Sequence, residues 1–253
     1  MERNARAGRA ALSGRLRMLA DMVTPGSRLA DVGCDHAFLS IYLVQAGICP
    51  SALAMDVRRG PLAGAKQHVE EYGLGDYITL RLSDGLEAYR AGEADSLVCA
   101  GMGGRLMERI LGEGMDQAKS LGELILQPQS ELPRFRAFLR EAGFQVTQER
   151  AVREDGKYYF AMKARPVEGN PGACGRPGDR TDGFGLYDLF GEHLLKQRDQ
   201  VLFSYLRQRG SYLERLAASL ARADSRKAGG RSEEVREELA RIEEALGYYS
   251  SIE

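Results

Sequence analysis

Short apolar runs alternate with segments of helical periodicity from about residue 28 to residue 163. Each apolar run has the length of a β-strand and is nearly continuous, which is typical of parallel strands buried on both faces of a sheet. The predicted strands span residues 29–32, 52–56, 78–82, 96–100 and 124–127. The segments between them include predicted helices over residues 61–72, 106–111 and 132–142. This alternation predicts an α/β fold with a doubly wound parallel sheet.

After Gly143 the alternation gives way to a different pattern. Residues 146–153 and 158–164 are predicted strands, and they flank Asp155-Gly156, a dipeptide that favours a two-residue hairpin turn. The sheet is therefore expected to end in an antiparallel pair. A nicotinamide-binding sheet continues through further crossover units instead, so this order favours a methyltransferase.

The C-terminal part of the chain is predicted to form a linker and a helical hairpin. Residues 166–186 are rich in glycine, proline and arginine and hold too little apolar surface to fold alone. Beyond them, leucines recur at heptad-compatible spacing, interrupted by Arg209, and a second apolar repeat runs from Val235 to Tyr249. We expect Gly229-Gly230 to form the turn and Ser232 to cap the second helix. The predicted organisation is a domain over residues 1–165, a linker over 166–186 and an antiparallel coiled-coil hairpin over 187–253.

The composition is that of an ordinary globular protein. Of the 253 residues, 43% are hydrophobic, which is enough for a substantial core. No apolar run approaches the roughly 20 residues that a membrane-spanning helix needs, and the arginine-rich N-terminus lacks an apolar signal region. We therefore expect a cytoplasmic protein with no membrane partner. Cys34, Cys49, Cys99 and Cys174 form no CxxC pair, so we expect reduced thiols and no metal site.

The net charge of -1 argues against a protein that coats nucleic acid indiscriminately, but the charges are sorted by segment. Arginines crowd the first 17 residues, and Lys and Arg dominate residues 196–231, whereas glutamates dominate the last predicted helix. Two interpretations remain open at this point: solvated helix faces, or a local surface that docks a phosphate backbone.

The stretch from Leu29 to Leu39 has the pattern of a buried strand that breaks at Gly33 and re-enters a helix. A small molecule can bind against such a break. One glycine is present where a dinucleotide fingerprint has three, so close approach of the backbone to a pyrophosphate is not expected. Acids at Asp31 and Asp35, with Asp56 at the end of the next predicted strand, suit a ligand that carries a ribose and a cationic centre.

Several motifs follow one another along the chain. They are Leu12-Ser13-Gly14-Arg15-Leu16, residues 31–39, Ser83-Asp84-Gly85-Leu86, Ala100-Gly101-Met102-Gly103-Gly104, Leu126-Gln127-Pro128-Gln129 and Glu154-Asp155-Gly156-Lys157-Tyr158-Tyr159. As an ordered set they resemble the bacterial tRNA adenine-22 N1-methyltransferase family. The resemblance spans nearly the whole chain and includes the helical hairpin introduced by Tyr187-Asp188-Leu189-Phe190-Gly191. It implies a class I methyltransferase with a Rossmann-like sheet and S-adenosylmethionine as cofactor.

The resemblance places a cofactor site at the ends of the predicted strands. Asp56 would accept hydrogen bonds from both ribose hydroxyls, and Asp84 with the amide of Gly85 would contact the adenine. Asp31 or Asp35 would face the ammonium group of the methionine moiety. A solvated acid at Asp56 and a plain turn residue at Asp84 are the structural alternatives. The expected cofactor-binding set is Asp31, Gly33, Asp35, Asp56, Asp84, Gly85, Ala100 and Gly101.

The methyl acceptor is expected against the loop that follows the fourth predicted strand. Many amino-directed methyltransferases of nucleic acids carry an Asn/Asp-Pro-Pro-aromatic loop there, whereas this chain has glycines. Because N1 of adenine already has an in-plane lone pair, it needs orientation more than activation. Gly103 and Gly104 alternatively pack the next helix closely, and Arg15 alternatively forms a salt bridge. The expected substrate-binding set is Arg15, Met102, Gly103, Gly104 and Tyr159.

Methylation at N1 creates a cationic adenine, which a carboxylate can stabilise or deprotonate at its amine. Asp35 is the catalytic candidate, with His36 as its orienter or as a phosphate contact. The resemblance implies that a monomer binds tRNA and methylates a base displaced from its stack in the D-arm region. Two other functions remain open: a methyltransferase of small molecules whose hairpin mediates dimerisation, and a non-catalytic RNA-binding module.

Overall fold

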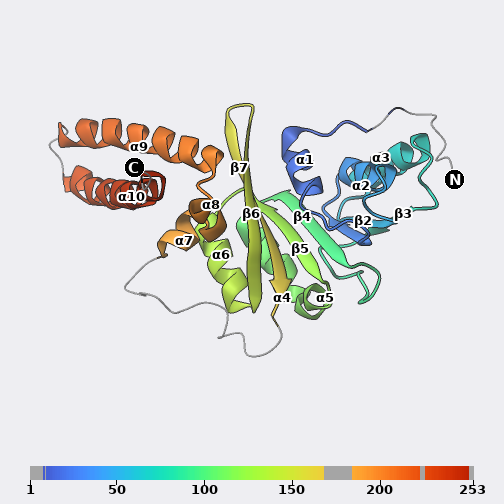
Figure 1. Cartoon of the computed structure of the whole chain (residues 1–253). Helices are drawn as coiled ribbons and strands as arrows, with labels where there is room; N and C mark the ends of the chain where they lie inside the picture. The colour runs from blue at the N-terminus through green and yellow to red at the C-terminus, as the bar shows by residue number, and fades with distance from the viewer. Residues whose placement is uncertain (1–7, 9, 168–183, 223–225, 251–253) are drawn as a thin grey trace. The chain divides into compact units, whose positions relative to one another are not determined.

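The computed structural model describes residue 8 and residues 10–167, 184–222 and 226–250 (Figure 1). Cys174 and most of the predicted linker lie outside these described residues. The internal contacts divide the chain into two compact units, residues 1–178 and 179–253.

A seven-stranded sheet forms the centre of the first unit (Figure 1). Its strands are β1 (Leu29–Val32), β2 (Ala52–Asp56), β3 (Ile78–Leu82), β4 (Ser96–Met102), β5 (Glu123–Pro128), β6 (Phe144–Glu154) and β7 (Lys157–Pro166). The spatial order is β3-β2-β1-β4-β5-β7-β6, with β1 to β5 parallel and β7 antiparallel to β5 and β6. The predicted parallel sheet closed by an antiparallel pair is confirmed. Because the strand order reverses between β1 and β4, a ligand crevice is expected at the carboxyl ends of these two strands.

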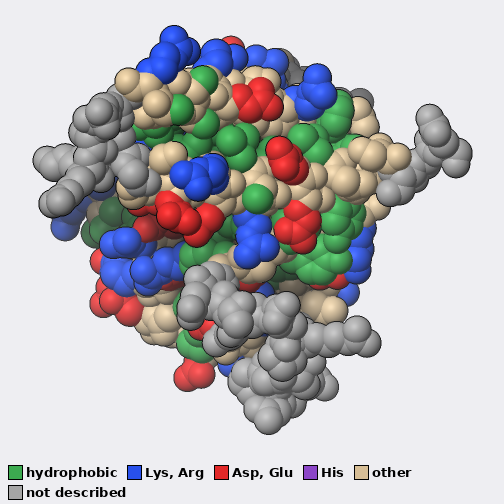
Figure 2. Space-filling view, turned by 90° about the vertical axis from the view of Figure 1, so that its left-hand side faces the viewer, with side chains coloured by type: hydrophobic (Ala, Val, Ile, Leu, Met, Phe, Trp, Pro, Cys, Tyr) green, Lys and Arg blue, Asp and Glu red, His purple; other side chains and the backbone are tan. Residues whose placement is uncertain are grey.

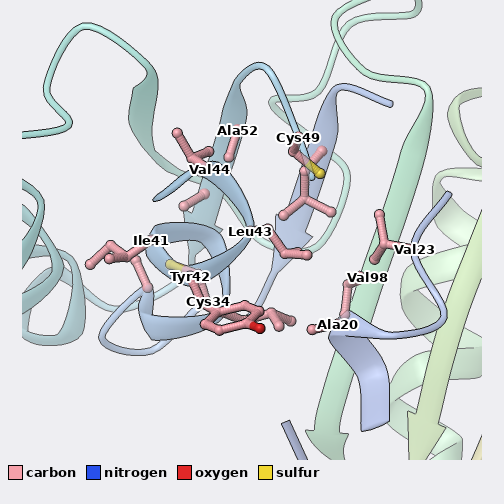
Figure 3. Close-up of a cluster of buried hydrophobic side chains, with 14 of the residues drawn as sticks. Ala20, Val23, Cys34, Ile41, Tyr42, Leu43, Val44, Cys49, Ala52 and Val98 are labelled. Carbon is pink, nitrogen blue, oxygen red and sulfur yellow. The ribbon is translucent and has the colours of Figure 1, made fainter. Parts of the chain in front are cut away.

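Helices cover both faces of this sheet. They are α1 (Gly14–Ala20), α2 (Phe38–Gln45), α3 (Arg59–Glu71), α4 (Gly104–Glu113), α5 (Met115–Lys119) and α6 (Leu132–Glu141). Buried side chains of α1, α2 and α3 form one hydrophobic core and those of α4, α5 and α6 form a second one, because alternate residues of each strand point to opposite faces. In the first core, Ala20 of α1 lies near Val98 of β4, and Leu43 of α2 points toward the same region (Figure 3).

Three cysteines are buried in the first unit as free thiols, as expected from their spacing. Burial raises the pKa of Cys49 and of Cys99 to about 12. Thiolate is therefore scarce at neutral pH, and these side chains act as small apolar core residues.

The second unit contains α7 (Leu186–Phe190), α8 (Glu192–Lys196), α9 (Gln200–Ala221) and α10 (Arg226–Ser250). Arg209 of α9 contacts Glu238 of α10, and Tyr249 near the end of α10 donates a hydrogen bond to the carbonyl of Asp199 at the start of α9. These contacts show that α9 and α10 run antiparallel to each other. Buried side chains between them include Leu206 of α9 and Ile242 of α10.

Two details of the predicted hairpin are wrong. Helix α10 begins at Arg226, so Gly229 and Gly230 lie inside the helix and Ser232 is not its N-cap. Two glycines cost a helix about 2 kcal/mol relative to alanine, and the apolar face that α10 packs on α9 outweighs this cost. Arg209 does not disrupt the seam, because its guanidinium forms a bidentate ion pair with Glu238.

No helix in the described ranges is both long enough and apolar enough to cross a membrane. Within the same ranges, His, Cys, Asp and Glu side chains form no group of three that could hold a metal ion.

Candidate functional site

A cavity of about 580 Å³ opens in the first unit at the carboxyl ends of the parallel strands. Its walls come from the turn after β1, the ends of β2 and β3, the end of β4, helix α4 and the start of α1. The predicted site residues among those that line it are Arg15, Asp31, Gly33, Asp35, His36, Asp56, Asp84, Gly85, Ala100, Gly101 and Met102. Residues that are far apart in the sequence therefore meet at the crevice that the strand order creates.

The turn between β1 and α2 has an unusual backbone. Gly33, Asp35 and Ala37 have φ angles of 74°, 50° and 58°, a region that residues with a side chain seldom adopt. A Cβ atom on Gly33 would lie 2.7 Å from the terminal methyl of Met102, so glycine lets the turn and the Met102 side chain approach closely. Such strain is concentrated at ligand-binding turns.

Two buried carboxylates form the floor of the cavity. Asp31 is 5% exposed and accepts a hydrogen bond of 2.7 Å from Ser40 Oγ. Its pKa is raised to about 6, chiefly by burial and further by the charge of Asp56. Asp56, also 5% exposed, accepts hydrogen bonds from the backbone amides of Asp35 at 3.2 Å and Arg58 at 2.9 Å.

The Cys34 thiol lies in the negative electrostatic field of these acids. Burial raises its pKa, and the charges of Asp31, Asp56 and Asp35 raise it further. The same field attracts a cation. The floor of the cavity is therefore suited to a ligand with an ammonium or sulfonium centre.

Asp84 and Gly85 form the wall that follows β3. Both oxygens of Asp84 face the guanidinium of Arg109 on α4, at 2.9 and 3.3 Å. Gly85 has a φ angle of 56°, and a Cβ atom there would lie 2.9 Å from the side chain of Ile110. Arg109 cannot be identified from the sequence as the partner of Asp84, because the pair forms only once α4 packs beside β4.

Four of the sequence motifs meet around Arg15. Its guanidinium donates to Gln127 Oε1 at 3.0 Å and lies over the ring of Tyr159, 5.7 Å from the ring centre. A Cβ atom on Gly101 would be 3.5 Å from the same guanidinium. Glu154 accepts hydrogen bonds from the backbone amides of Gly14 and Arg15, which ties α1 to the tip of the β6–β7 hairpin.

The two glycines after Met102 lie outside the cavity wall. A Cβ atom on Gly104 would come within 2.6 Å of the carbonyl oxygen of Ser130, and one on Gly103 within 3.2 Å of its hydroxyl. Both glycines therefore allow α4 to pack closely against the turn before α6. This geometry fits a packing role for Gly103 and Gly104.

Asp35 and His36 lie at the exposed rim of the cavity. Their side chains are 64% and 48% exposed, and Asp35 Oδ1 is 3.8 Å from His36 Nε2. The His36 ring is 5.5 Å from the His68 ring, and Phe38 is 4.6 Å from His68. The rim thus carries a carboxylate beside a small cluster of aromatic rings.

Comparisons with known proteins agree with this geometry. A family model described as a methyltransferase domain matches residues 12–162. The chain is 33% identical over 217 residues to the tRNA (adenine(22)-N(1))-methyltransferase of Bacillus subtilis. The aligned region covers 84% of this chain and 87% of that relative.

Solved structures give the same result over nearly the whole chain. The B. subtilis m1A22 tRNA methyltransferase TrmK is 30% identical, with a TM-score of 0.77 over 94% of this chain and 99% of that one. The M. capricolum TrmK, solved with S-adenosyl-homocysteine, is 25% identical, with a TM-score of 0.74 over 94% of this chain and 98% of that one.

Proposed function

The chain belongs to the bacterial tRNA (adenine-22 N1)-methyltransferase family, and from this membership we infer its function. It is an S-adenosylmethionine-dependent enzyme that transfers a methyl group to N1 of adenine 22 in tRNA. The observation that carries this function is the convergence of five of the six motifs between residues 12 and 159 on one cavity with an acidic floor.

The residues of the cavity fit S-adenosylmethionine. Asp56 is at the end of β2, where its carboxylate can accept from the two ribose hydroxyls. Asp84 and the Gly85 amide would contact the adenine edge, while Asp31 and Gly33 would receive the methionine moiety with its ammonium group. When bound, the cofactor supplies an electrophilic methyl group on a sulfonium, which the acidic floor attracts.

The acceptor side of the cavity needs to orient the base rather than activate it. Adenine N1 has a lone pair in the plane of the ring, so a base held in line with the methyl group can react without prior deprotonation. Gly101 and Met102 would supply backbone and apolar surface beside the cofactor pocket, and the Arg15 guanidinium adjoins Gly101. Tyr159 does not line the cavity itself and would act through Arg15, which lies over its ring. Arg15 is also placed to contact a phosphate of the displaced nucleotide.

Asp35 and His36 are the proposed catalytic residues. The reaction leaves a positive charge on the adenine ring, and a carboxylate nearby favours that charge in the transition state. Asp35 lies at the cavity rim, and its neighbour His36 would orient it or contact the backbone of the tRNA.

The second unit is proposed to bind tRNA. Arg207 and Arg215 on α9 and Arg222 at its C-cap are exposed, and Glu214 is the one acidic residue of α9. On α10, by contrast, Arg231 and Arg241 pair with Glu234 and Glu244. The enzyme is proposed to act as a monomer in the cytoplasm, where its substrate occurs.

The deciding experiment incubates the protein with unmodified tRNA and methyl-labelled S-adenosylmethionine and then identifies the labelled nucleoside. We expect 1-methyladenosine. A labelled small molecule with unlabelled tRNA would favour a small-molecule methyltransferase, and no transfer at all would favour a non-catalytic RNA-binding module. Either result would refute the proposed function.

A further inference from the structure

Gln127, near the end of β5, has a buried side-chain nitrogen without a hydrogen-bond partner. Its amide oxygen accepts the hydrogen bond from Arg15 at 3.0 Å. Because a guanidinium only donates, the oxygen must face Arg15, and the Nε2 donor must point elsewhere. Among the described residues, this nitrogen is the one buried polar side-chain atom that lacks a partner.

The stability of the fold does not explain this amide. A buried donor without an acceptor loses its hydrogen bonds to water and gains none in the protein. An unbranched apolar side chain of similar length, such as methionine, would fill the same space without that loss. Gln127 does not itself line the cavity, but it lies directly beneath Arg15, which does, and this position offers a reason for its polarity.

Residues 100–104, at the end of β4 and the start of α4, form the proposed acceptor loop. The strand order places Gln127 on the side of this loop that is away from the proposed cofactor site. Strand β4 lies between β1 and β5, and Gln127 pairs in register with Ala100 of β4. Ala100 and Gly101 line the cavity, and the cofactor-binding turn follows β1. From β1 to β5, the sheet therefore presents the cofactor floor, the acceptor loop and then the Gln127 amide.

This position matches the shape of the reacting base. When adenine N1 faces the methyl group, the ring nitrogens N3 and N7 lie on the two other edges of the base, and both are hydrogen-bond acceptors. A donor on the β5 side of the acceptor loop would meet one of these two edges.

Arg15 covers the amide in the free protein, and its contacts there are replaceable. They are one hydrogen bond to a neutral group and one contact with the face of Tyr159. An incoming nucleotide offers the guanidinium a phosphate, which forms stronger charge-assisted hydrogen bonds, and its base can take the place of the guanidinium on the tyrosine ring.

We propose that Gln127 contacts the substrate: once Arg15 moves away, Nε2 donates a hydrogen bond to a ring nitrogen of the target adenine and so orients N1 toward the methyl group. This inference rests on the proposed function.

Two variants distinguish the role of the Gln127 side-chain oxygen from that of its nitrogen. Gln127→Met removes both the oxygen and the nitrogen, while Gln127→Glu keeps an acceptor for Arg15 and removes the donor. Gln145→Met, at an exposed position at the start of β6, is the matched control. For each protein, kcat and KM for tRNA methylation, cofactor affinity by calorimetry and Tm are measured.

We expect both Gln127 variants to lower kcat by about 10- to 100-fold, with KM for tRNA and the cofactor Kd within about 3-fold of wild type. The Tm of Gln127→Met should equal or exceed that of wild type, because the unpartnered donor is gone, and Gln145→Met should be unchanged throughout. Wild-type kcat in Gln127→Glu would overturn the inference, as would a fall of Tm in step with activity in Gln127→Met. If the wild-type protein itself methylates no tRNA, the proposed function fails rather than the role of Gln127.

Discussion

At the scale of single residues, burial controls the chemistry of Asp31. The carboxylate is almost inaccessible to water, and its pKa of about 6 follows mainly from that burial, while the hydrogen bond from Ser40 opposes the shift. Since this pKa lies above the ordinary value of an aspartate, ionisation of Asp31 destabilises the free protein as pH rises from about 4 to 6. A cationic ligand reverses this penalty by pairing with the charged form.

Cofactor affinity should therefore depend on pH through Asp31. The ammonium group of S-adenosylmethionine is charged below about pH 8, so affinity follows the ionisation of Asp31 and should rise about 10-fold from pH 5 to pH 7. Calorimetric titration across this range measures the effect. In Asp31→Asn the affinity should be lower and nearly independent of pH, and an unchanged slope in that variant would assign the titration to another group.

The two acids Asp56 and Asp35 should have separable effects. Asp56→Asn removes the charge proposed to bind the ribose diol, so cofactor affinity should fall about 100-fold. Asp35→Asn should leave that affinity within about 3-fold and lower the single-turnover rate about 10-fold. Asp76→Asn, at an exposed loop position, serves as the control. Normal cofactor binding by Asp56→Asn would refute its ribose role, and an unaltered single-turnover rate would remove Asp35 from the mechanism.

Residues that follow a strand could be placed from the sequence, whereas their partners could not. Asp56 and Asp84 follow apolar runs of strand length, and parallel strands bring their carboxyl ends to one edge. Arg109 and Gln127 depend on how a helix and a neighbouring strand pack, and no periodicity records that packing. The packing role of Gly104 likewise appears only in the folded chain.

At the scale of elements, the β6–β7 hairpin holds helix α1 by its N-terminus. The first amides of a helix lack partners within it, and here Ser13 Oγ accepts from Leu16 while Glu154 accepts from Gly14 and Arg15. A seven-residue helix is too short to be stable alone, so these contacts fix where Arg15 lies.

Removal of the Glu154 contact should loosen the acceptor side of the site. Glu154→Ala is expected to cost about 1 kcal/mol in unfolding free energy and to lower tRNA methylation several-fold, with cofactor affinity unchanged. Ser13→Ala removes a cap of the same helix without breaking the link to the hairpin, so it should cost a similar stability with a smaller loss of activity. Equal losses of activity in the two variants would show that activity depends on capping of α1 and not on its link to the β6–β7 hairpin.

Three short strands have the bounds that the sequence predicts, whereas other elements are missed or misplaced. The bounds of β1, β2 and β3 match the predicted apolar runs. Helix α5 was missed, since five residues are too few to show a helical period. The start of α10 was misplaced because two consecutive glycines indicate a turn, although packing on α9 holds them in a helix.

At the scale of the whole molecule, the near-zero net charge hides a local separation of charges. On the face drawn in Figure 2, Lys and Arg side chains lie among Asp and Glu side chains, so no single sign dominates it. Within the second unit, however, α9 presents exposed arginines and α10 presents arginines that pair with glutamates. The uneven distribution of charge along the sequence therefore corresponds to a difference between α9, which is basic, and α10, where arginines and glutamates pair.

The salt dependence of tRNA binding should report this difference. Replacing Arg207, Arg215 and Arg222 by alanine should weaken binding and reduce the slope of log K against log salt by about 2 to 3, as expected for three lost phosphate contacts. The matched triple variant of Arg231, Arg236 and Arg241 on α10 should change the slope by less than about 1. Filter binding at several salt concentrations provides the values, and equal slopes for the two triple variants would argue against docking through α9.

The most direct measurement of the enzyme's activity is primer extension on tRNA that the protein has treated with S-adenosylmethionine. A methyl group on N1 lies on the edge of adenine that forms base pairs, so it stops the polymerase immediately 3′ of position 22. We predict this stop with the wild-type protein and its loss with Asp56→Asn or with a tRNA that lacks adenine at position 22. Full-length extension after wild-type treatment, or a stop at another position, would contradict the assignment.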